Sequence, residues 1–418
     1  MRHIGWTIIL ACVVSGSIQG ETPYHDLDAP PHLYHQRIPQ DRFSRLKRDL
    51  ESGSTHGLAA DKGEKEFLLA LLKALDIPTT SQMWVFSTTS LQLSLISPSN
   101  PRALFFNEDT YVGYIPGGRI EVISIDPELG GIFYIFDIPR EGQPARPERS
   151  GRCMNCHANE DTGQVPGLLA KSVIPGPGGG SLTAFRIGVT GHSIPFKERF
   201  GGWFVTGLGG ITNHVGNLVG RLSAQGLAMT PRPPEGAFNA SHYPEPTSDA
   251  LAQLLHEHQV GFVNRVVEAS YRARTLMHSS KGILTGSQDA ELESQAAILV
   301  RYLLFAEEAA VPPNQILAQS AFKKDFLKNR RVGPRGRSLK DLSLESRLMR
   351  HRCSYMIYTP LFTGMPEVIL GKVYRRLSKA LAPGGTEAES ASLQAEEKEA
   401  IREILRETAP AIPRGLFP

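Results

Sequence analysis

Two cysteines three residues apart, followed at once by a histidine, constrain this chain more than any other feature. The pentad is Cys153-Met-Asn-Cys156-His157. Two thiols at this spacing can add to the two vinyl groups of one porphyrin, and the adjacent imidazole then lies beneath the iron as an axial ligand. With 4 Cys and 13 His in 418 residues, chance produces this pattern in roughly one such chain per thousand. The pentad therefore predicts a haem c site, with Cys153 and Cys156 binding the porphyrin and His157 the iron.

Two other kinds of site use such a cysteine pair: a thioredoxin-like redox disulfide and a structural zinc site. A redox pair usually opens a helix after a buried strand, whereas residues 143–152 before this pair are polar and loop-like. A zinc site needs four ligands, usually in two close pairs. The other candidate pair, His351 and Cys353, lies far along the chain, so both alternatives are weaker than haem c.

The N-terminus predicts export. A short basic start, an apolar run over residues 8–14 and small residues up to Gly20 are typical of a signal peptide, here residues 1–20. We therefore expect a periplasmic or otherwise exported protein, which suits a haem that is attached outside the bacterial cytoplasm. Cys12 offers a lipid-anchored form as an alternative, but it lies very early in the segment. No later stretch is long and apolar enough for a membrane helix, so no transmembrane segment is expected after signal removal.

Charge and cysteine content narrow the possible partners. The chain has 45 basic and 42 acidic side chains and a formal net charge of +3, which argues against nucleic acid as a partner. After signal removal, Cys353 is the one cysteine outside the pentad. It lies in an apolar setting, so we expect a buried, inert thiol and no disulfide framework.

The pattern along the chain predicts an α+β multidomain protein, in which a β-rich segment leads into the haem c region and an all-α C-terminal domain follows. Residues 21–80 are expected to form an N-terminal arm and a short amphipathic helix over 64–75. Residues 81–225 form the β-rich haem c-binding region, and residues 226–247 a Pro-rich linker. Residues 248–413 form the helical C-terminal domain.

Individual elements follow from periodicity and from turn residues. Strands are expected at residues 84–86, 103–106, 111–114, 119–125, 132–138, 182–189 and 202–207. The loop over 126–131 should connect the fourth and fifth of these as a hairpin. Helices are expected from an N-cap at Ser248 to about Met277, and over residues 292–308, 366–381 and 393–407.

Several segments resemble a family of large, uncharacterised exported bacterial monohaem c-type cytochrome proteins. The resemblance is carried by residues 81–87 (SQMWVFS), 106–113 (FNEDTYVG), 130–134 (GGIFY), 156–158 (CHA), 165–167 (VPG) and 195–207 (PFKERFGGWFVTG). It covers most of residues 80–413 and implies a multidomain exported cytochrome with haem c, but no substrate. Where family members have Thr-His-Gly, this chain has Leu208-Gly-Gly210, so no role for a histidine at that place is carried over.

The second axial ligand of the iron is not specified by any signature. His192 lies in a Gly-rich loop and resembles a histidine common in the family, and His258 lies on an apolar helix stripe. Both are candidate distal ligands, weighed against a turn histidine and a hydrogen-bonded core histidine respectively. His256 should point roughly opposite to His258, because two residues advance a helix by about 200°. Other candidates left open are His214, Met229, Met277, Met356 and Met365.

The second ligand decides the function. A Met or His there favours electron transfer, whereas an open face favours small-ligand binding or peroxide chemistry. The sequence favours an exported electron carrier over an enzyme, with periplasmic redox proteins as partners. The alternative is a haem enzyme or gas sensor with an open sixth site, since the β-rich segment resembles, in architecture only, haem domains in which a sheet covers the haem. A scaffold with a vestigial haem is a third, weaker interpretation.

Overall fold

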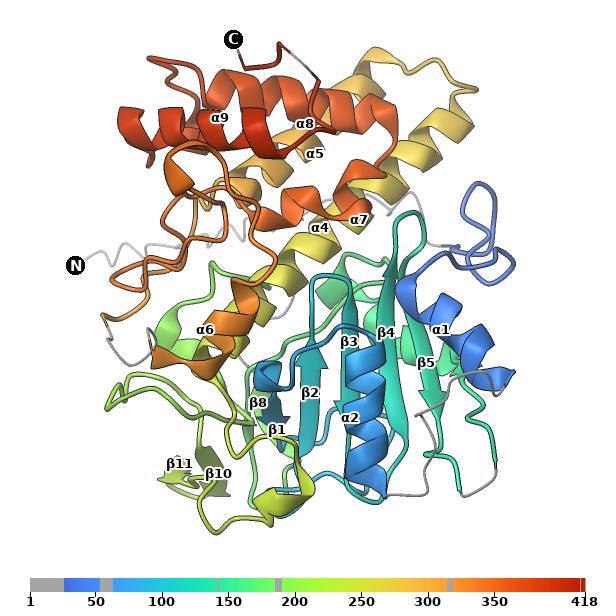
Figure 1. The fold of residues 1–418 in the computed structure, drawn as a ribbon, viewed down its shortest axis with the longest axis vertical. Helices are drawn as coiled ribbons and strands as arrows, with labels where there is room; N and C mark the ends of the chain where they lie inside the picture. Colours follow the sequence, from blue (N-terminus) through green and yellow to red (C-terminus); the bar gives the residue numbers. More distant parts are fainter. Residues whose placement is uncertain are drawn as a thin grey trace, which may run out of the picture.

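The computed structural model describes residues 26–52, 63–140, 143–184, 190–313, 319–413 and 415–417. The predicted signal peptide at 1–20, with Cys12, lies outside these residues. The described chain is a mixed α and β protein with an antiparallel sheet and a helical C-terminal region (Figure 1). That coarse prediction is confirmed.

A seven-stranded antiparallel sheet has the order β6-β5-β4-β3-β2-β1-β9. Its strands are β1 (Met83–Val85), β2 (Arg102–Phe106), β3 (Thr110–Tyr114), β4 (Ile120–Asp126), β5 (Gly130–Phe136), β6 (Glu148–Arg149) and β9 (Trp203–Phe204). A second, two-stranded sheet pairs β7 (Val173–Pro175) with β8 (Ser181–Ala184). A strand lies in each predicted range, although the range 202–207 contains only the two residues of β9, and β4 and β5 form the predicted hairpin. Residues 185–189 of the predicted strand 182–189 lie outside the described residues.

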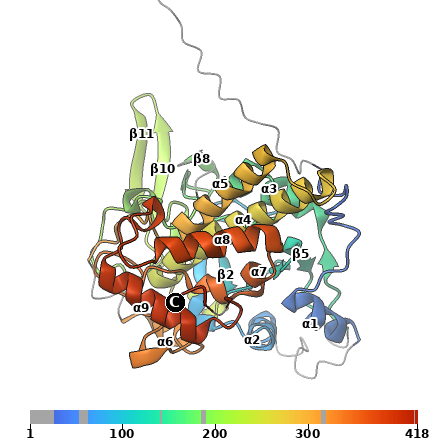
Figure 2. The same ribbon diagram turned by 90° about the horizontal axis from the view of Figure 1, so that it is seen from above.

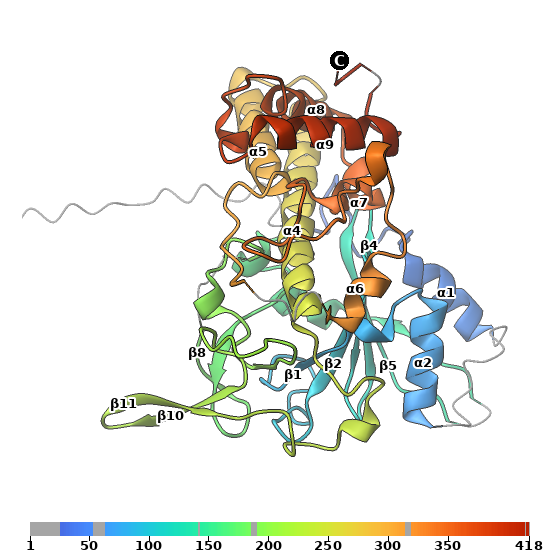
Figure 3. The ribbon, with the colours of Figure 1, turned by 60° about the vertical axis from the view of Figure 1, so that its left-hand side comes forward.

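Two helices cover one face of the seven-stranded sheet, and the long helix α4 (Ala250–Ser279) crosses the other face (Figure 3). The covering helices are α1 (Arg42–Glu51) and α2 (Glu64–Ala74), of which α2 is the predicted helix. The sequence predicts an N-terminal arm before this helix, but residues 26–52 are packed on the sheet, because Tyr34 and Phe43 are buried in its core. Asp41 caps α1 through the backbone N–H of Ser44 and accepts a hydrogen bond from the Tyr134 hydroxyl. Buried aromatic residues thus hold this segment against the sheet. Their spacing in the sequence is too irregular to show a helix or strand period.

The C-terminal region is helical. It contains α4 (Ala250–Ser279), α5 (Gly286–Leu303), α6 (Ala321–Phe326), α7 (Pro360–Thr363), α8 (Glu367–Ala380) and α9 (Ala395–Thr408). The N-cap of α4 is Asp249, whose carboxylate accepts from the N–H groups of Leu251 and Ala252. The prediction of Ser248 was wrong, because its hydroxyl donates to the carbonyl of Phe204 and accepts from Trp84 N–H instead. In the part of the chain described, no helix meets the length and hydropathy needed to cross a bilayer.

The segment predicted as a linker begins with a strand. Residues Gly226–Pro231 form β11, which pairs with β10 (Leu218–Ser223) in a hairpin. This hairpin projects from the body of the molecule (Figure 2). Farther along, Tyr243 is buried against Trp84. Pro231 ends β11, where an exposed strand edge tolerates proline. The other prolines that suggested a linker come after this strand.

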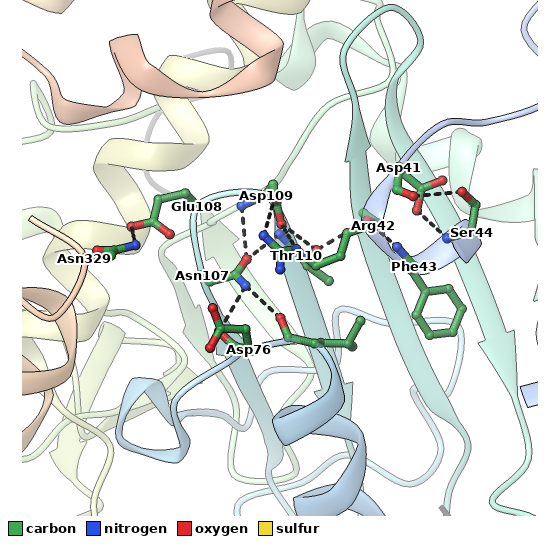
Figure 4. Close-up of polar contacts among 12 residues, drawn as sticks. Asp41, Arg42, Phe43, Ser44, Asp76, Asn107, Glu108, Asp109, Thr110 and Asn329 are labelled. Atoms are coloured by element: carbon green, nitrogen blue, oxygen red, sulfur yellow. Dashed lines mark hydrogen bonds and ion pairs between the residues drawn. The ribbon is translucent and has the colours of Figure 1, made fainter. Parts of the chain in front are cut away.

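The sheet and the helical region share one hydrophobic core. The larger buried cluster joins Met83 and Phe106 of the sheet to Leu255 and Leu377 of the helices. The loop between β2 and β3 adds polar links on both sides (Figure 4). There, Asn107 donates to the carbonyls of Leu75 and Asp76, and Asp109 binds Arg42 at 2.9 Å. Glu108 contacts Asn329 and Lys340 of the helical region.

Candidate functional site

The pentad forms one helical turn. A 3-10 turn over Gly151–Cys153 continues into α3 (Met154–His157). Because residues three apart lie on the same side of a helical turn, Cys153 and Cys156 face the same way. Both thiols are free of disulfides, Cys156 is exposed and Cys153 half-buried. Two reduced thiols on one side of a turn, one of them open to solvent, are what covalent attachment of a porphyrin requires.

His157 is oriented by the backbone of a later loop. Its Nδ1–H donates to the carbonyl of Gly167 at 2.9 Å, and the N–H of Gly167 donates back to the carbonyl of His157 at 2.8 Å. Within the described ranges, Nε2 has no hydrogen-bond partner. Burial lowers the pKa of His157 to about 4, so the ring is neutral at pH 7. A neutral imidazole with Nδ1 bonded to a carbonyl presents the Nε2 lone pair to a metal.

The loop that holds His157 is itself fixed by the sheet and by α4. The N–H of Gly131 donates to the carbonyl of Pro166 at 2.8 Å. The side chain of Asn264 accepts from the N–H of Leu168 at 2.8 Å and donates to its carbonyl at 3.0 Å. A Cβ on Gly167 would lie 2.5 Å from the Asn264 oxygen, so glycine is needed at this approach. Residues distant in sequence therefore set the orientation of the imidazole.

The pentad packs against the sheet through His157. The His157 ring lies 4.8 Å from the ring of Phe133. Phe133 on β5 is directly opposite Ile123 on β4, which is directly opposite Tyr111 on β3. Directly opposite residues project from the same face of a sheet, so these three form one apolar row. The pentad thus lies at one end of a row of side chains that runs toward α4.

The two predicted distal ligands contact each other. Nδ1 of His192 lies 2.8 Å from Nδ1 of His258, and Nε2 of His258 lies 2.8 Å from Oγ of Ser354. Both histidines are fully buried, and His192 stacks on Tyr302 and Phe305. No contact joins them to the pentad among the residues described, and both nitrogens of His258 already have partners. The geometry matches a hydrogen-bonded core pair, and it gives neither residue support as a distal ligand.

The remaining sequence candidates lie elsewhere. His214 is a turn histidine, because its Nε2 bonds the carbonyl of Ile211 and its Nδ1 accepts from the N–H of Gly216. Met229 is exposed on β11. Met356 and Met365 are packed in the large core, and Met277 lies near the C-terminal end of α4. Cys353 is fully buried, as predicted, and burial raises the pKa of its thiol to about 12.

His256 was passed over in the sequence. It projects from α4 on the side opposite to His258, as the helical geometry predicted. Its ring lies 5.3 Å from that of Phe106 and 5.6 Å from that of Tyr111. It is 6% exposed and lines a cavity with Met83, Ala170, Lys171, Phe200, Trp203, Gln253 and Glu257. Burial lowers its pKa to about 3, so the ring is neutral. In the sequence, the two-residue offset from His258 indicates that His256 lies on the opposite side of the helix. Only the fold shows that this side of α4 packs against the sheet.

The donor set fits a covalently held porphyrin. It consists of two free thiols on one side of a turn and one neutral imidazole whose Nε2 has no partner in the described chain. Among the described residues, cysteine, histidine and carboxylate side chains do not gather in a group of three or more suited to a metal ion. Comparison with known proteins gave no matching family model, no matching curated protein and no matching solved structure.

Proposed function

We propose that the protein is an exported monohaem c-type cytochrome that transfers electrons. Cys153 and Cys156 would hold the porphyrin by two thioether bonds, and Nε2 of His157 would bind the iron. When bound, the haem supplies one-electron redox chemistry. The observation that carries the proposal is the orientation of His157, whose Nδ1 bond to Gly167 leaves Nε2 available beside two free thiols.

The protein's own part is to hold that imidazole still. Gly167 fixes the ring orientation, and Asn264 fixes Gly167 through its neighbour Leu168. Such outer hydrogen bonds raise the basicity of a metal-bound histidine and limit its movement. A ligand that moves little between oxidation states suits electron transfer. The resemblance to exported monohaem cytochromes supports the same proposal.

Haem staining tests the proposal directly. The full chain is expressed with its own N-terminus in a host that attaches haem c, denatured on a gel and stained for haem-linked peroxidase activity. We expect a stained band whose mass exceeds the processed polypeptide by one haem. Cys153→Ser combined with Cys156→Ser should abolish the stain, whereas Cys353→Ser, the matched control, should keep it. An unstained wild-type band, with zinc found by elemental analysis, would refute the proposal.

The competing function, a haem enzyme or gas sensor, depends on whether the second face of the iron is open. His192 and His258 bond each other, so neither supports a closed second face of the iron. This observation favours retaining the alternative function. The absorption spectrum of the reduced protein with and without carbon monoxide separates the two functions. An unchanged spectrum supports a six-coordinate electron carrier, and a prompt shift supports an open site.

A further inference from the structure

Part of one face of the seven-stranded sheet is only half covered by the described chain. On the central strands β2 and β4, Leu104 and Ile123 are half-buried, whereas the alternate residues, which face α1 and α2, are fully buried. Leu104 and Ile123 lie on the same face as Phe106 and Tyr111, and these two aromatic residues are buried in the core that contains α4. The helix α4 therefore covers only one end of this face.

The half-covered part, called the open patch below, is apolar at its centre. Leu104 is directly opposite Gly113, and Gly113 is directly opposite Glu121. Ile123 is the next residue of β4 on the same face. A glycine inside a strand is typical of a place where a ligand approaches the backbone closely. Polar residues usually occupy the solvated face of an antiparallel sheet, so leucine, glycine and isoleucine here indicate a surface that a ligand covers.

An ion pair borders the open patch. Nη1 of Arg102 donates to Oε2 of Glu121 at 2.8 Å. The other oxygen of Glu121 accepts from the Ser90 hydroxyl and from the Gln92 amide. Nε of Arg102 is buried, and no residue in the described ranges accepts a hydrogen bond from it. A guanidinium with an unused donor at the edge of an apolar surface is suited to bind a carboxylate.

The open patch lies beside the pentad. His157 contacts Phe133, which is directly opposite Ile123. Glu121 is two residues from Ile123 on the same strand, so its Cα lies about 8 Å from that of Phe133. Burial raises the pKa of the Cys153 thiol, and the charge of Glu121 adds to this rise, as expected of a carboxylate near the pentad. A porphyrin tethered at the pentad is therefore within reach of the patch.

We propose that the haem packs on the open patch, with its apolar ring over Leu104, Gly113 and Ile123 and one propionate on Nε of Arg102. The inference rests on the proposed function, because it requires a haem bound covalently at the pentad. A porphyrin is apolar except at its two propionates. This arrangement therefore removes apolar surface from water on both partners and gives a propionate a cation.

Methyl nuclear magnetic resonance of the ferrous protein, kept low-spin by its own second ligand or by carbon monoxide, tests where the ring lies. In this diamagnetic state the porphyrin ring current shifts the resonances of nearby methyl groups. The haem-free reference is Cys153→Ser combined with Cys156→Ser, and the variants Leu104→Met and Ile123→Val assign the signals. We expect haem to shift the methyl resonances of Leu104 and Ile123, and to leave unchanged those of Ile401 in α9. Unshifted Leu104 and Ile123 resonances would overturn the placement.

Reduction potentials of variants that retain covalent haem test the role of Arg102. Arg102→Gln should lower the potential, because loss of a nearby cation favours the ferric form, which carries one more positive charge. Arg102→Lys should stay close to the wild type. Arg42→Gln, which removes a cation from the ion pair with Asp109, is the matched control and should leave the potential unchanged. An Arg102→Gln protein with the wild-type potential would refute the propionate contact.

The two measurements distinguish failure of this inference from failure of the proposed function. A wild type without covalent haem is a failure of the proposed function, and the gel stain detects it before either measurement. If Arg102→Gln does not fold, the methyl spectra still decide the placement, because they use the wild-type ion pair.

Discussion

At the scale of single residues, the site is organised by hydrogen bonds from the backbone and from one amide side chain. The pentad supplies the chemistry, but Gly167 and Asn264 supply the orientation. The two bonds between Asn264 and Leu168 are buried, and buried backbone groups that lose their partners are costly. His32 is another buried side chain whose surroundings affect stability. Its ring stacks on the ring of Tyr271.

Asn264→Ala should loosen the loop that holds His157. It removes both bonds to Leu168, so we expect a loss of about 2 kcal/mol in the free energy of unfolding. Asn264→Asp keeps the acceptor for the Leu168 N–H but loses the donor, so its loss should be smaller. Urea unfolding of the three proteins measures this order. Equal stability of Asn264→Ala and the wild type would show that Asn264 does not hold the loop.

His32 should make stability fall in acid. Burial, with smaller effects from Arg274 and Arg37, lowers the pKa of His32 to about 4. Between pH 6.5 and pH 4 the unfolded chain therefore binds a proton that the native state does not, so stability is lost as the pH falls through this window. The loss is on the order of 1–3 kcal/mol. Urea unfolding from pH 7 to pH 4.5 should show that the free energy of unfolding depends less steeply on pH in His32→Gln and in His32→Phe than in the wild type. An unchanged pH dependence in both variants would show that His32 is not the group responsible.

At the scale of elements, α4 is the centre of the molecule. This helix is buried along most of its 30 residues. One side meets the sheet through His256, and the other meets α5 through His258 and Tyr302. A helix buried on both sides has no free polar face, so its histidines must find partners within the protein or in a ligand. This explains why two histidines two residues apart have different surroundings.

Gly261→Ala should destabilise the protein because α4 packs closely at that point. A Cβ on Gly261 would lie 2.2 Å from the Tyr302 hydroxyl and 2.9 Å from the Cα of Gly191. We expect a loss of about 1–3 kcal/mol by overpacking, despite the better helix propensity of alanine. Gly371→Ala in α8 is the matched control. A Cβ there meets only the end of the Arg375 side chain, at 3.5 Å, so that variant should gain up to about 1 kcal/mol. Thermal unfolding checks both signs.

At the scale of the whole molecule, the sheet and the helices are packed against each other. The large core includes residues from Met83 to Phe417, and the loop of Asn107 and Glu108 links both regions. Lys340 is almost fully buried where it meets Glu108, Asn329 and the Phe326 carbonyl. Regions joined by a shared core and a partly buried ion pair should unfold together.

Lys340→Met should test this coupling. It leaves Glu108 without its cation, so we expect a loss of about 1–3 kcal/mol, and Glu108→Gln combined with Lys340→Met should recover part of it. Far-ultraviolet and near-ultraviolet circular dichroism should follow one common unfolding transition in all three proteins. Separate transitions for the two signals would show that the helical region unfolds independently.

Local patterns predicted much of the fold. Alternating apolar residues and turn residues predicted the strands β1 to β5 and the hairpin between β4 and β5, because both depend on neighbours in the chain. Leucine spacing predicted α2 for the same reason. Local patterns failed at residues 26–52, where burial of Tyr34 and Phe43 depends on the sheet. They also failed at β11, whose strand depends on pairing with β10.

The sequence by itself determined the chemistry proposed for the site, because the two thiols and the adjacent imidazole are fixed relative to one another by covalent spacing. Only the tertiary structure decided the surroundings of each histidine. It paired His192 with His258, gave His157 the carbonyl of Gly167, and placed His256 over the sheet, where no described residue gives it a hydrogen bond. These outcomes depend on which elements pack against α4, and packing between distant segments leaves no periodic trace in the chain.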